Sequence, residues 1–384
     1  AAAQRLGGAG VRRQNGGMRR LSRVFLLLCV ALPAAAAEWS TVVSPRGQLF
    51  PSLILATANM PVPERTASTV IGDPGGLIGV RVRAERDNQP VRVAIKLPGW
   101  LRDTSMDVRL AKAGKWYSLY PVMEWEFALL RDFDRSAPET IRFELQLDDQ
   151  AIERKAERVR LRSINEAPYF VKDPKHPTNL AWMFAAYVDE DHPQVRRILS
   201  DALKGGTVDR FDGYQSRDPK RAMKQVYAIW RTLRGRGIRY SSIARTGNGQ
   251  SDVLSQNVRF IDESWGNAEA NCVDGTVLLA AALRKIDLNP ALVMVPGHMF
   301  LAFELSPGGE RSYLETTLIG DGLPAKGGES DAAAFANFRR ASERGHAQFQ
   351  KSRAHFGDQA APEYQIIDIG AARDMGVVPI GARR

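Results

Sequence analysis

The sequence predicts a mixed α+β protein in which an all-β part comes first and an α+β part follows. Between about residues 40 and 165, short segments alternate apolar with polar or charged residues, which is the pattern of half-buried strands. From about residue 219 onward, helical patterns are followed by strand-like segments, an order typical of an α+β domain. The length of 384 residues is enough for two domains or one large one.

The N-terminal segment has the pattern of an export signal. Residues 18–37 contain arginines, then the apolar run 24–32, then small residues, so we expect cleavage after Ala36 or Ala37. An apolar run of about nine residues is too short for a permanent membrane span, although an N-terminal membrane anchor is the alternative. We interpret residues 1–17 as a non-native leader and expect the mature protein to be soluble and exported, either periplasmic or secreted.

The net charge lies mostly in that same segment. The formal charge is +10, from 53 basic and 43 acidic residues. The first 37 residues hold six arginines and no acid, so the rest of the chain has 47 basic and 43 acidic residues, a charge of +4. These charges form no basic stripe with interleaved aromatic residues, so we do not expect nucleic-acid binding.

Residues 38–165 are predicted to form a β-sandwich of immunoglobulin-like type, because short alternating strands are separated by turn residues such as those at 87–90. The positions expected to face its core are Val80, Val82, Ala84, Val91, Val93, Ile95, Leu97, Ile141, Phe143, Leu145, Leu147, Val159 and Leu161. No cluster of reactive side chains stands out there. We therefore expect this domain to serve recognition, with contact to the cell envelope as one use.

Residues 166–218 are predicted to be a helical connecting segment, with two helices broken near His192 and ended at Gly205. The domain 219–384 is expected to begin with a helix that opens at Pro219 and stops at Gly235 or Gly237. The elements expected after it are a strand at 238–242, a helix at 272–286, strands at 291–295, 298–305 and 311–319, a basic amphipathic helix at 332–356 and a strand at 363–370.

Cys272 is the first residue with chemical interest. The chain has two cysteines, and Cys29 lies in the signal peptide, so an intrachain disulfide is excluded and a cysteine-based metal site is not expected. We predict no metal and no cofactor. Asn271 is a good N-cap, which places Cys272 in the first helical turn, where the positive end of the helix dipole favours the thiolate. An inert core residue and a reactive nucleophile both remain open.

A thiolate nucleophile needs an imidazole, and the imidazole needs a third group to orient it. His298 opens a strand directly after Pro296 and Gly297; alone it would be read as structural, but with a helix-capping cysteine upstream it becomes the candidate base. The other histidines are less suitable, because two flank prolines and two lie on different faces of one helix: His176, His192, His346 and His355.

Glu315 is the candidate third group. A hairpin with a two-residue period places Glu315 and His298 on one face of the sheet. A turn centred on Gly308 and Gly309 would leave the two residues offset along the strands, so a bulge or an asymmetric loop could be needed. The alternatives are that Glu315 is a solvated strand residue, or that Glu304 or Asp321 is the third group.

Three segments of this sequence resemble a known family. "NCVDGTVLLAAALRKI", "GHMFLAFEL" and "YLETT" are similar, in order and spacing, to the Cys, His and Asp blocks of the transglutaminase-like superfamily, which has a papain-type thiol fold. The Cys272-x-Asp274 step is common in its bacterial cysteine peptidase group. The resemblance covers about residues 219 to 320, outside the N-terminal domain. Two departures are Glu315 in place of the usual Asp, and "HMF" in place of an aromatic-rich step after the histidine.

The resemblance implies a C-terminal transglutaminase-like domain and an exported amidase or peptidase that acts on protein or cell-wall peptide amides through an acyl-enzyme. Cys272 would attack the carbonyl, His298 would protonate the leaving amine and Glu315 would hold the imidazole. Gln256 is the candidate second oxyanion donor beside the Cys272 amide, and Asp274 is expected to support the first helical turn. A cross-linking transglutaminase and a non-catalytic binding module with the same fold are the alternatives.

Overall fold

The computed structural model describes residues 37–61, 67–73, 75–242, 251–324, 328–357 and 361–381. The predicted leader, and the signal peptide as far as residue 36, lie outside these residues. Residues 37–384 form one compact unit of mixed α and β structure, so the predicted α+β class is confirmed. Within the described ranges, we find no helix with the length and apolar character that a membrane span requires.

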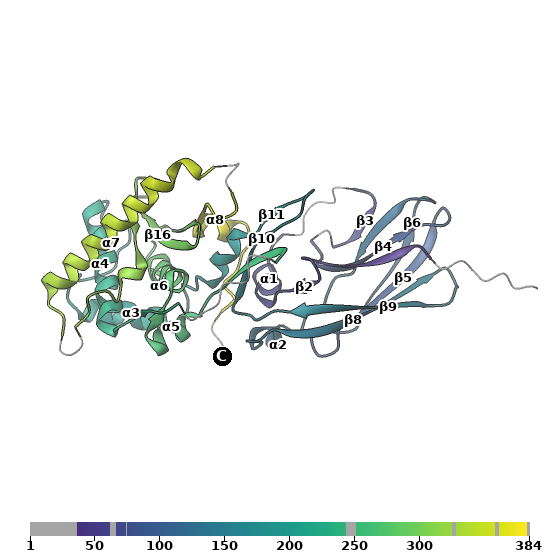
Figure 1. The fold of residues 1–384 in the computed structure, drawn as a ribbon, viewed down its shortest axis with the longest axis horizontal. Helices are drawn as coiled ribbons and strands as arrows, with labels where there is room; N and C mark the ends of the chain where they lie inside the picture. Colours follow the sequence, from purple (N-terminus) through teal and green to yellow (C-terminus); the bar gives the residue numbers. More distant parts are fainter. Residues whose placement is uncertain are drawn as a thin grey trace, which may run out of the picture. The chain divides into compact units, whose positions relative to one another are not determined.

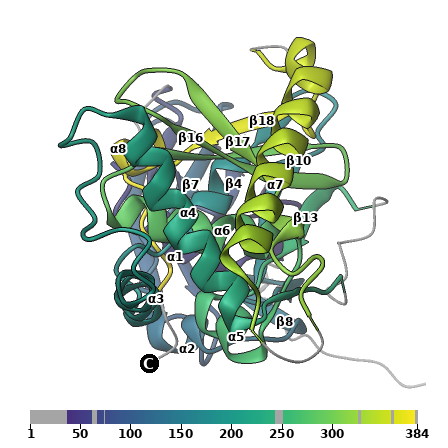
Figure 2. The same cartoon turned by 90° about the vertical axis from the view of Figure 1, so that its left-hand side faces the viewer.

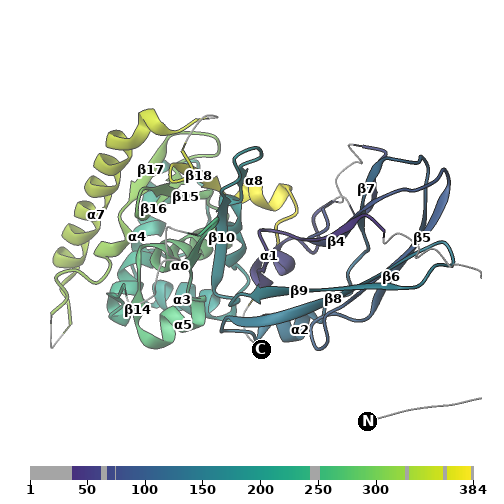
Figure 3. The same ribbon diagram turned by 45° about the vertical axis from the view of Figure 1, so that its right-hand side comes forward.

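Two sheets make up the N-terminal part (Figure 3). The first has four strands in the order β1-β4-β7-β3: β1 (Trp39–Val43), β4 (Ile78–Arg83), β7 (Trp116–Tyr120) and β3 (Val70–Gly72). The second has five strands in the order β2-β9-β8-β5-β6: β2 (Gln48–Leu49), β9 (Glu153–Leu161), β8 (Ala137–Leu147), β5 (Gln89–Lys96) and β6 (Thr104–Leu110). Two short helices accompany them: α1 (Pro51–Ala56) and α2 (Phe127–Arg131).

The predicted core faces of these sheets are confirmed. On β4, Val80 and Val82 are buried while Arg81 and Arg83 are exposed, because successive side chains of a strand point to opposite faces. All thirteen positions expected to face the core, from Val80 to Leu161, are buried.

Hydrogen bonds to β9 fix the first described residues in place. The Glu153 carboxylate accepts from the Ala37 amide at 2.6 Å and from the Trp39 indole at 2.7 Å.

The segment 166–218 differs from the prediction, because it begins with strands. β10 (Glu166–Val171) pairs antiparallel with β13 (Val253–Asn257) and with β11 (Thr178–Asn179). The sequence of β10 contains Pro168 and lacks clean alternation, so no strand was expected there. The two predicted helices are present as the 3-10 helix η1 (Ala181–Tyr187) and α3 (Pro193–Lys204).

The β-rich part and the α+β part are in contact through α1. All six residues of α1 are buried, and Ser52 Oγ donates to the Glu166 carbonyl at 2.5 Å. Near the C-terminus, the Val378 amide donates to the Ala56 carbonyl at 3.2 Å. The β-rich part and the α+β part are therefore joined through α1 and β10 into one unit.

Helices surround the centre of the α+β part (Figure 2). α4 (Pro219–Arg236) begins at the predicted proline and ends at Gly237, whose positive φ of 82° closes the helix in the left-handed conformation. Two short elements were not predicted, α5 (Ile261–Asn267) and β14 (Glu269–Ala270), and β14 pairs in parallel with β12 (Arg239–Tyr240). The basic helix α7 (Asp331–Ser352) packs against α4 through Trp230, whose indole donates to Asn337 at 3.0 Å.

The predicted cysteine helix, α6 (Cys272–Lys285), is the central element of this part (Figure 1). Every residue from Val273 to Leu283 is buried, including the five apolar positions expected to be. It contacts a sheet in the order β17-β16-β15-β18: β17 (Arg311–Leu314), β16 (His298–Glu304), β15 (Pro290–Val295) and β18 (Gln365–Asp368). The strand expected over 311–319 ends early, because η2 (Thr316–Leu318) follows it. The chain then ends with η3 (Arg353–His355), β18 and α8 (Ile369–Asp374).

Candidate active site

Cys272 is the first residue of α6, as predicted. The Asn271 side chain accepts hydrogen bonds from the amides of Val273 at 2.8 Å and Asp274 at 2.9 Å, and Asp274 Oδ2 accepts one from the Asn271 amide at 3.0 Å. This reciprocal capping box satisfies the amides on either side of Cys272. Its own amide lies in the first turn, where no carbonyl of the helix can accept from it. The Cys272 side chain is partly exposed and lines a cavity, unlike the apolar residues behind it.

Asp274 has the supporting position that was expected of it. Its carboxylate is buried and accepts from the Arg259 amide and the Arg259 guanidinium, both at 2.8 Å. Burial raises the pKa of Asp274, while the hydrogen bonds from Asn271 and Arg259 and the charge of Arg259 oppose that effect. Arg259 belongs to no motif, so the sequence did not indicate its part in holding the start of α6.

Two threonines connect the start of α6 with η2, and the sequence did not indicate them either. The Cys272 carbonyl accepts from Thr276 Oγ1 at 2.6 Å and from Thr316 Oγ1 at 3.4 Å. The two hydroxyls also lie 2.9 Å apart, and both residues are buried. Because Thr316 follows Glu315 directly, this contact fixes the cysteine relative to the acid.

His298 is the first residue of β16 and is positioned by a tight turn. It pairs with Val295 at the end of β15, and Gly297 between them has a φ of 69°, which suits the third position of a Pro-Gly turn. His298 Nε2 lies 2.7 Å from Glu315 Oε2. The hydrogen bond expected between this imidazole and this carboxylate is therefore present.

Glu315 lies one residue beyond β17, and its side-chain length suits that position. The ladder pairs Leu301 with Leu314, so Glu315 would face Phe300, two residues from His298 on the same side of the sheet. Such diagonal neighbours have Cα atoms about 7–8 Å apart, a gap that a long side chain can cross. The expected offset therefore exists, and the ladder shows no bulge. Thr317 holds the other carboxylate oxygen through its amide at 3.1 Å and its hydroxyl at 2.6 Å.

The electrostatics of the pair favour charged partners. Burial lowers the pKa of His298, but hydrogen bonds to Cys272 and Glu315, together with the charges of these two groups, outweigh it and raise that pKa to about 9. Burial raises the pKa of Glu315, but the hydrogen bond and charge of His298 and the hydrogen bonds from Thr317 outweigh it, so that pKa is lowered. At neutral pH the structure therefore supports an imidazolium next to a carboxylate.

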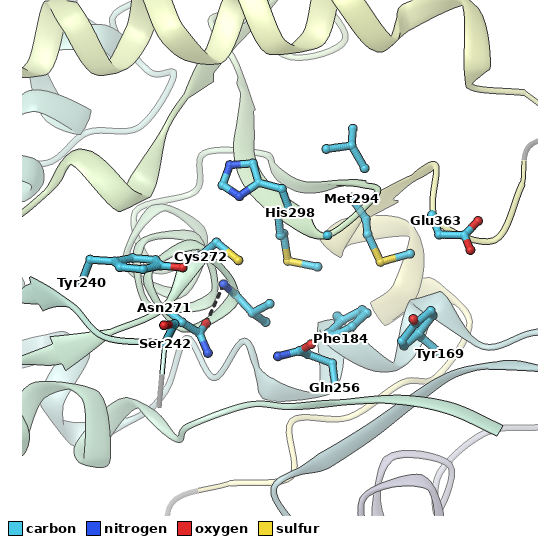
Figure 4. A pocket seen from close by; sticks show the side chains of 14 residues that line it. Tyr169, Phe184, Tyr240, Ser242, Gln256, Asn271, Cys272, Met294, His298 and Glu363 are labelled. Carbon is cyan, nitrogen blue, oxygen red and sulfur yellow. Dashed lines mark hydrogen bonds between the residues drawn. The ribbon is translucent and has the colours of Figure 1, made fainter. Parts of the chain in front are cut away.

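Figure 4 shows the cavity that contains the sulfur of Cys272, with the His298 ring beside it. Its volume is about 190 Å³. The wall away from the cysteine is apolar and aromatic, formed by Tyr169, Phe184 and Met294, with Glu363 at its far end. We name this space the acyl cavity. It is open enough to leave the His298 side chain 22% exposed.

Gln256, on β13, lines the acyl cavity together with Cys272 (Figure 4). Its side-chain amide donates to the Asn257 carbonyl at 3.0 Å, so its N–H groups are not all free for a ligand. Gln256 is thus brought to the site, and a donor role stays a prediction. Tyr240 also lines this cavity; burial, followed by the charges of Cys272, Glu315 and Asp274, raises its pKa.

The remaining candidate groups have other partners. Glu304 accepts from Asn289 at 2.7 Å and from the Gly308 amide at 2.8 Å, and Asp321 pairs with Arg340. His192 is the N-cap of α3, where Nδ1 accepts from the Gln194 amide, rather than an ordinary loop residue. Across the described part of the chain, no group of three or more His, Cys, Asp or Glu side chains could hold a metal ion.

The arrangement as a whole provides a thiol at a helix N-terminus, an imidazole that lines the same cavity, and a buried carboxylate hydrogen-bonded to Nε2 of that imidazole. This set can form a thiolate, stabilise it with an imidazolium, and deliver a proton to a leaving group. Comparison of the chain with protein-family models, with curated proteins and with solved structures finds no match.

Proposed function

We propose that this protein is a thiol-dependent amidase or peptidase that acts through Cys272, His298 and Glu315. The observation that carries the proposal is that Cys272 and His298 line one cavity, and that the His298 imidazole lies 2.7 Å from the Glu315 carboxylate. Such an orienting carboxylate keeps the ring in one tautomer and stabilises the imidazolium.

The reaction begins with attack of the Cys272 thiolate on an amide carbonyl carbon. A C–S bond forms, and the carbonyl π electrons move to the oxygen, which faces the Cys272 amide and, on this proposal, the Gln256 side chain. The C–N bond then breaks and the amine leaves with the proton from His298. Water, deprotonated by His298, attacks the thioester; the acid is released and Cys272 is regenerated.

The fold details that go with this function are also proposals. The α+β part would be a papain-type, transglutaminase-like domain at 219–384, because the cysteine begins a helix and His298 and Glu315 come from adjacent antiparallel strands. The two sheets of residues 38–165 would form an immunoglobulin-like sandwich that contacts substrate or the cell envelope. The export signal at 18–37 would place the enzyme in the periplasm or outside the cell.

Hydrolysis is favoured over amine transfer by the exposure of the site. Cys272 is partly exposed and His298 is 22% exposed, so water can reach a thioester formed there. A cross-linking transglutaminase would need water kept away until an amine arrives. A non-catalytic binding module would not need the buried Glu315, which costs desolvation unless His298 is charged.

Mass spectrometry of peptide-amide mixtures incubated with the purified protein tests this proposal. We expect cleavage products from the wild type and none from the Cys272→Ala variant. Addition of a small primary amine should leave the free acid as the main product. Cleavage that persists in Cys272→Ala would overturn the proposed nucleophile, and a main product joined to the added amine would favour the cross-linking alternative.

A further inference from the structure

His298 also lines a second cavity. Its volume is about 470 Å³, and it is lined by His298, Glu315 and Thr317 on one side and by α7 on the other. Cys272 does not line it. Of the residues that the structure describes, His298 is the one that lines both the acyl cavity and this one, which we name the α7 cavity.

One face of α7 supplies the polar wall of the α7 cavity. Arg340, Arg344 and Gln348 are spaced at i, i+4 and i+8, so their side chains lie above one another on the helix. Two guanidinium groups at this spacing repel each other unless anions are present. The site is therefore built from two cations and an amide donor on a single helical face.

The charges around this face do not cancel. Glu315 is paired with His298, and Asp321 is paired with Arg340. Among the described residues, no ion pair involves Arg344, whereas Arg339, five residues earlier on α7, pairs with Glu343 at 3.3 Å. One guanidinium thus faces the α7 cavity without a counter-ion, next to the imidazolium–carboxylate pair.

Contacts between α7 and β17 set the position of the arginines relative to His298. The Glu315 amide donates to the Ala341 carbonyl of α7 at 3.0 Å. Gly345, adjacent to Arg344, lies so close to β17 that an added Cβ would be 2.6 Å from the Leu314 nitrogen. The Tyr313 ring stacks on Phe349 with 4.1 Å between centroids. These contacts hold the cationic face of α7 in place beside the catalytic pair.

We propose that the α7 cavity binds a carboxylate on the leaving-group side of the substrate, through Arg344 with Arg340 and Gln348. This proposal rests on the proposed hydrolase function. His298 must reach the leaving amine to protonate it, so the leaving group lies on the imidazole side of Cys272. The α7 cavity borders this same histidine and not Cys272. Arginine suits a carboxylate because its planar fork can donate two parallel hydrogen bonds.

Three peptide amides with the same acyl part test the proposal. One has a leaving residue with a free terminal carboxylate, the second has that carboxylate capped as an amide, and the third is capped but carries an aspartate side chain. We expect the wild type to prefer one of the two anionic peptides over the neutral one by about three- to tenfold in kcat/KM at low salt. The preferred peptide identifies the carboxylate as terminal or side-chain.

Arg344→Gln should remove that preference, by lowering kcat/KM for the anionic peptide toward the value for the neutral one. Arg339→Gln is the matched control, because this arginine lies on the same helix, five residues before Arg344, and does not line the cavity. It should keep the preference. A wild type that treats all three peptides alike, or an Arg344→Gln variant that keeps the preference, would overturn the carboxylate site.

Equilibrium binding to the Cys272→Ala protein separates this inference from the proposed function. Fluorescence anisotropy of the labelled peptides should show tighter binding of the anionic form, lost in the Cys272→Ala, Arg344→Gln double variant. That result would support the site even if no peptide were cleaved. Equal binding of anionic and neutral peptides would overturn the site even if the wild type cleaved them all.

Discussion

At the scale of single residues, the site depends on the reach of Glu315. The sheet register leaves this residue one step beyond β17 and two residues out of line with His298. A glutamate crosses that diagonal and arrives at 2.7 Å, with Thr317 holding its other oxygen. A glutamate side chain is one methylene longer than that of an aspartate. This extra length spans the offset between Glu315 and His298 along the two strands.

We expect Glu315→Gln to fold and to lower kcat by at least roughly tenfold, about 1.4 kcal/mol of barrier, because a neutral amide stabilises the imidazolium less. Glu315→Asp should also lose activity, since the shorter side chain falls short of His298. Single-turnover kinetics, with circular dichroism to check folding, measure both. A Glu315→Gln variant with wild-type kcat would show that no working triad includes this acid.

The pH dependence follows from the raised pKa of His298. The folded pKa of about 9 is above the ordinary 6.5, so the charged imidazole contributes to the free energy of unfolding fully below pH 6.5. This contribution is lost as the pH rises through about 9. We expect kcat/KM to fall over the same alkaline range, because the proton for the leaving amine is lost.

In Glu315→Gln the alkaline fall of kcat/KM should move to lower pH, because the carboxylate helps to keep the proton on His298. A pH–rate profile of both proteins measures the two positions. Identical profiles would mean that Glu315 does not act through the imidazole charge.

At the scale of elements, α7 and β17 position the acid through direct backbone contact. A Cβ on Gly345 would meet the Leu314 nitrogen at 2.6 Å and the Tyr313 carbonyl carbon at 2.7 Å. Both neighbours are backbone atoms, so the helix itself would have to move. The Glu315 amide hydrogen bond to Ala341 would be stretched by the same movement.

Gly345→Ala should therefore destabilise the protein by about 1–3 kcal/mol and lower kcat as well, because Glu315 shifts with the helix. Thermal unfolding and the peptide assay measure the two effects. Gly235→Ala on α4 is the matched control, since an added Cβ there has no neighbour within 4 Å. Gly235 lies in the last turn of α4, so that change should be neutral or stabilising by at most about 0.5–1 kcal/mol. Equal effects at both glycines would contradict the close-contact argument.

The sequence predicted those helices and strands that have a clear hydrophobic periodicity of their own. α4, α6 and the strands β4, β5, β8 and β9 have long apolar repeats or clean alternation, and they were found where the sequence predicted them. β10 has a proline in an irregular segment, and α5 is only seven residues long, so neither has a local signal. The early end of β17 depends on contact with α7, which no local pattern encodes.

The candidate site was predictable to a similar extent. Cys272, His298 and Glu315 stand at recognisable positions, at a helix start, after a Pro-Gly turn and near a strand end. Arg259, Thr276 and Thr316 were not predicted, because their partners lie 15 to 44 residues away in the chain. The α7 arginines looked like part of a solvated helix until the fold placed them beside His298.

At the scale of the whole molecule, the N-terminal part and the α+β part share one core. α1 is buried on all sides, and hydrogen bonds join Ser52 to Glu166 and Ala56 to Val378. A fragment that begins at Glu166 would expose apolar surface that α1 now covers. We expect this fragment to unfold at a clearly lower temperature than the protein that begins at Ala37. Equal melting temperatures in calorimetry would show that the two parts are independent domains.

The rate at which Cys272 is alkylated by iodoacetamide tests the central claim most directly. If the His298 imidazolium stabilises a Cys272 thiolate, the wild type at pH 7 should react at least about tenfold faster than His298→Ala, with the label on Cys272 by mass spectrometry. The cysteine is single within the described residues, so the label reports on one site. Equal rates in the two folded proteins would contradict the thiolate–imidazolium pair, and with it the proposed catalytic chemistry.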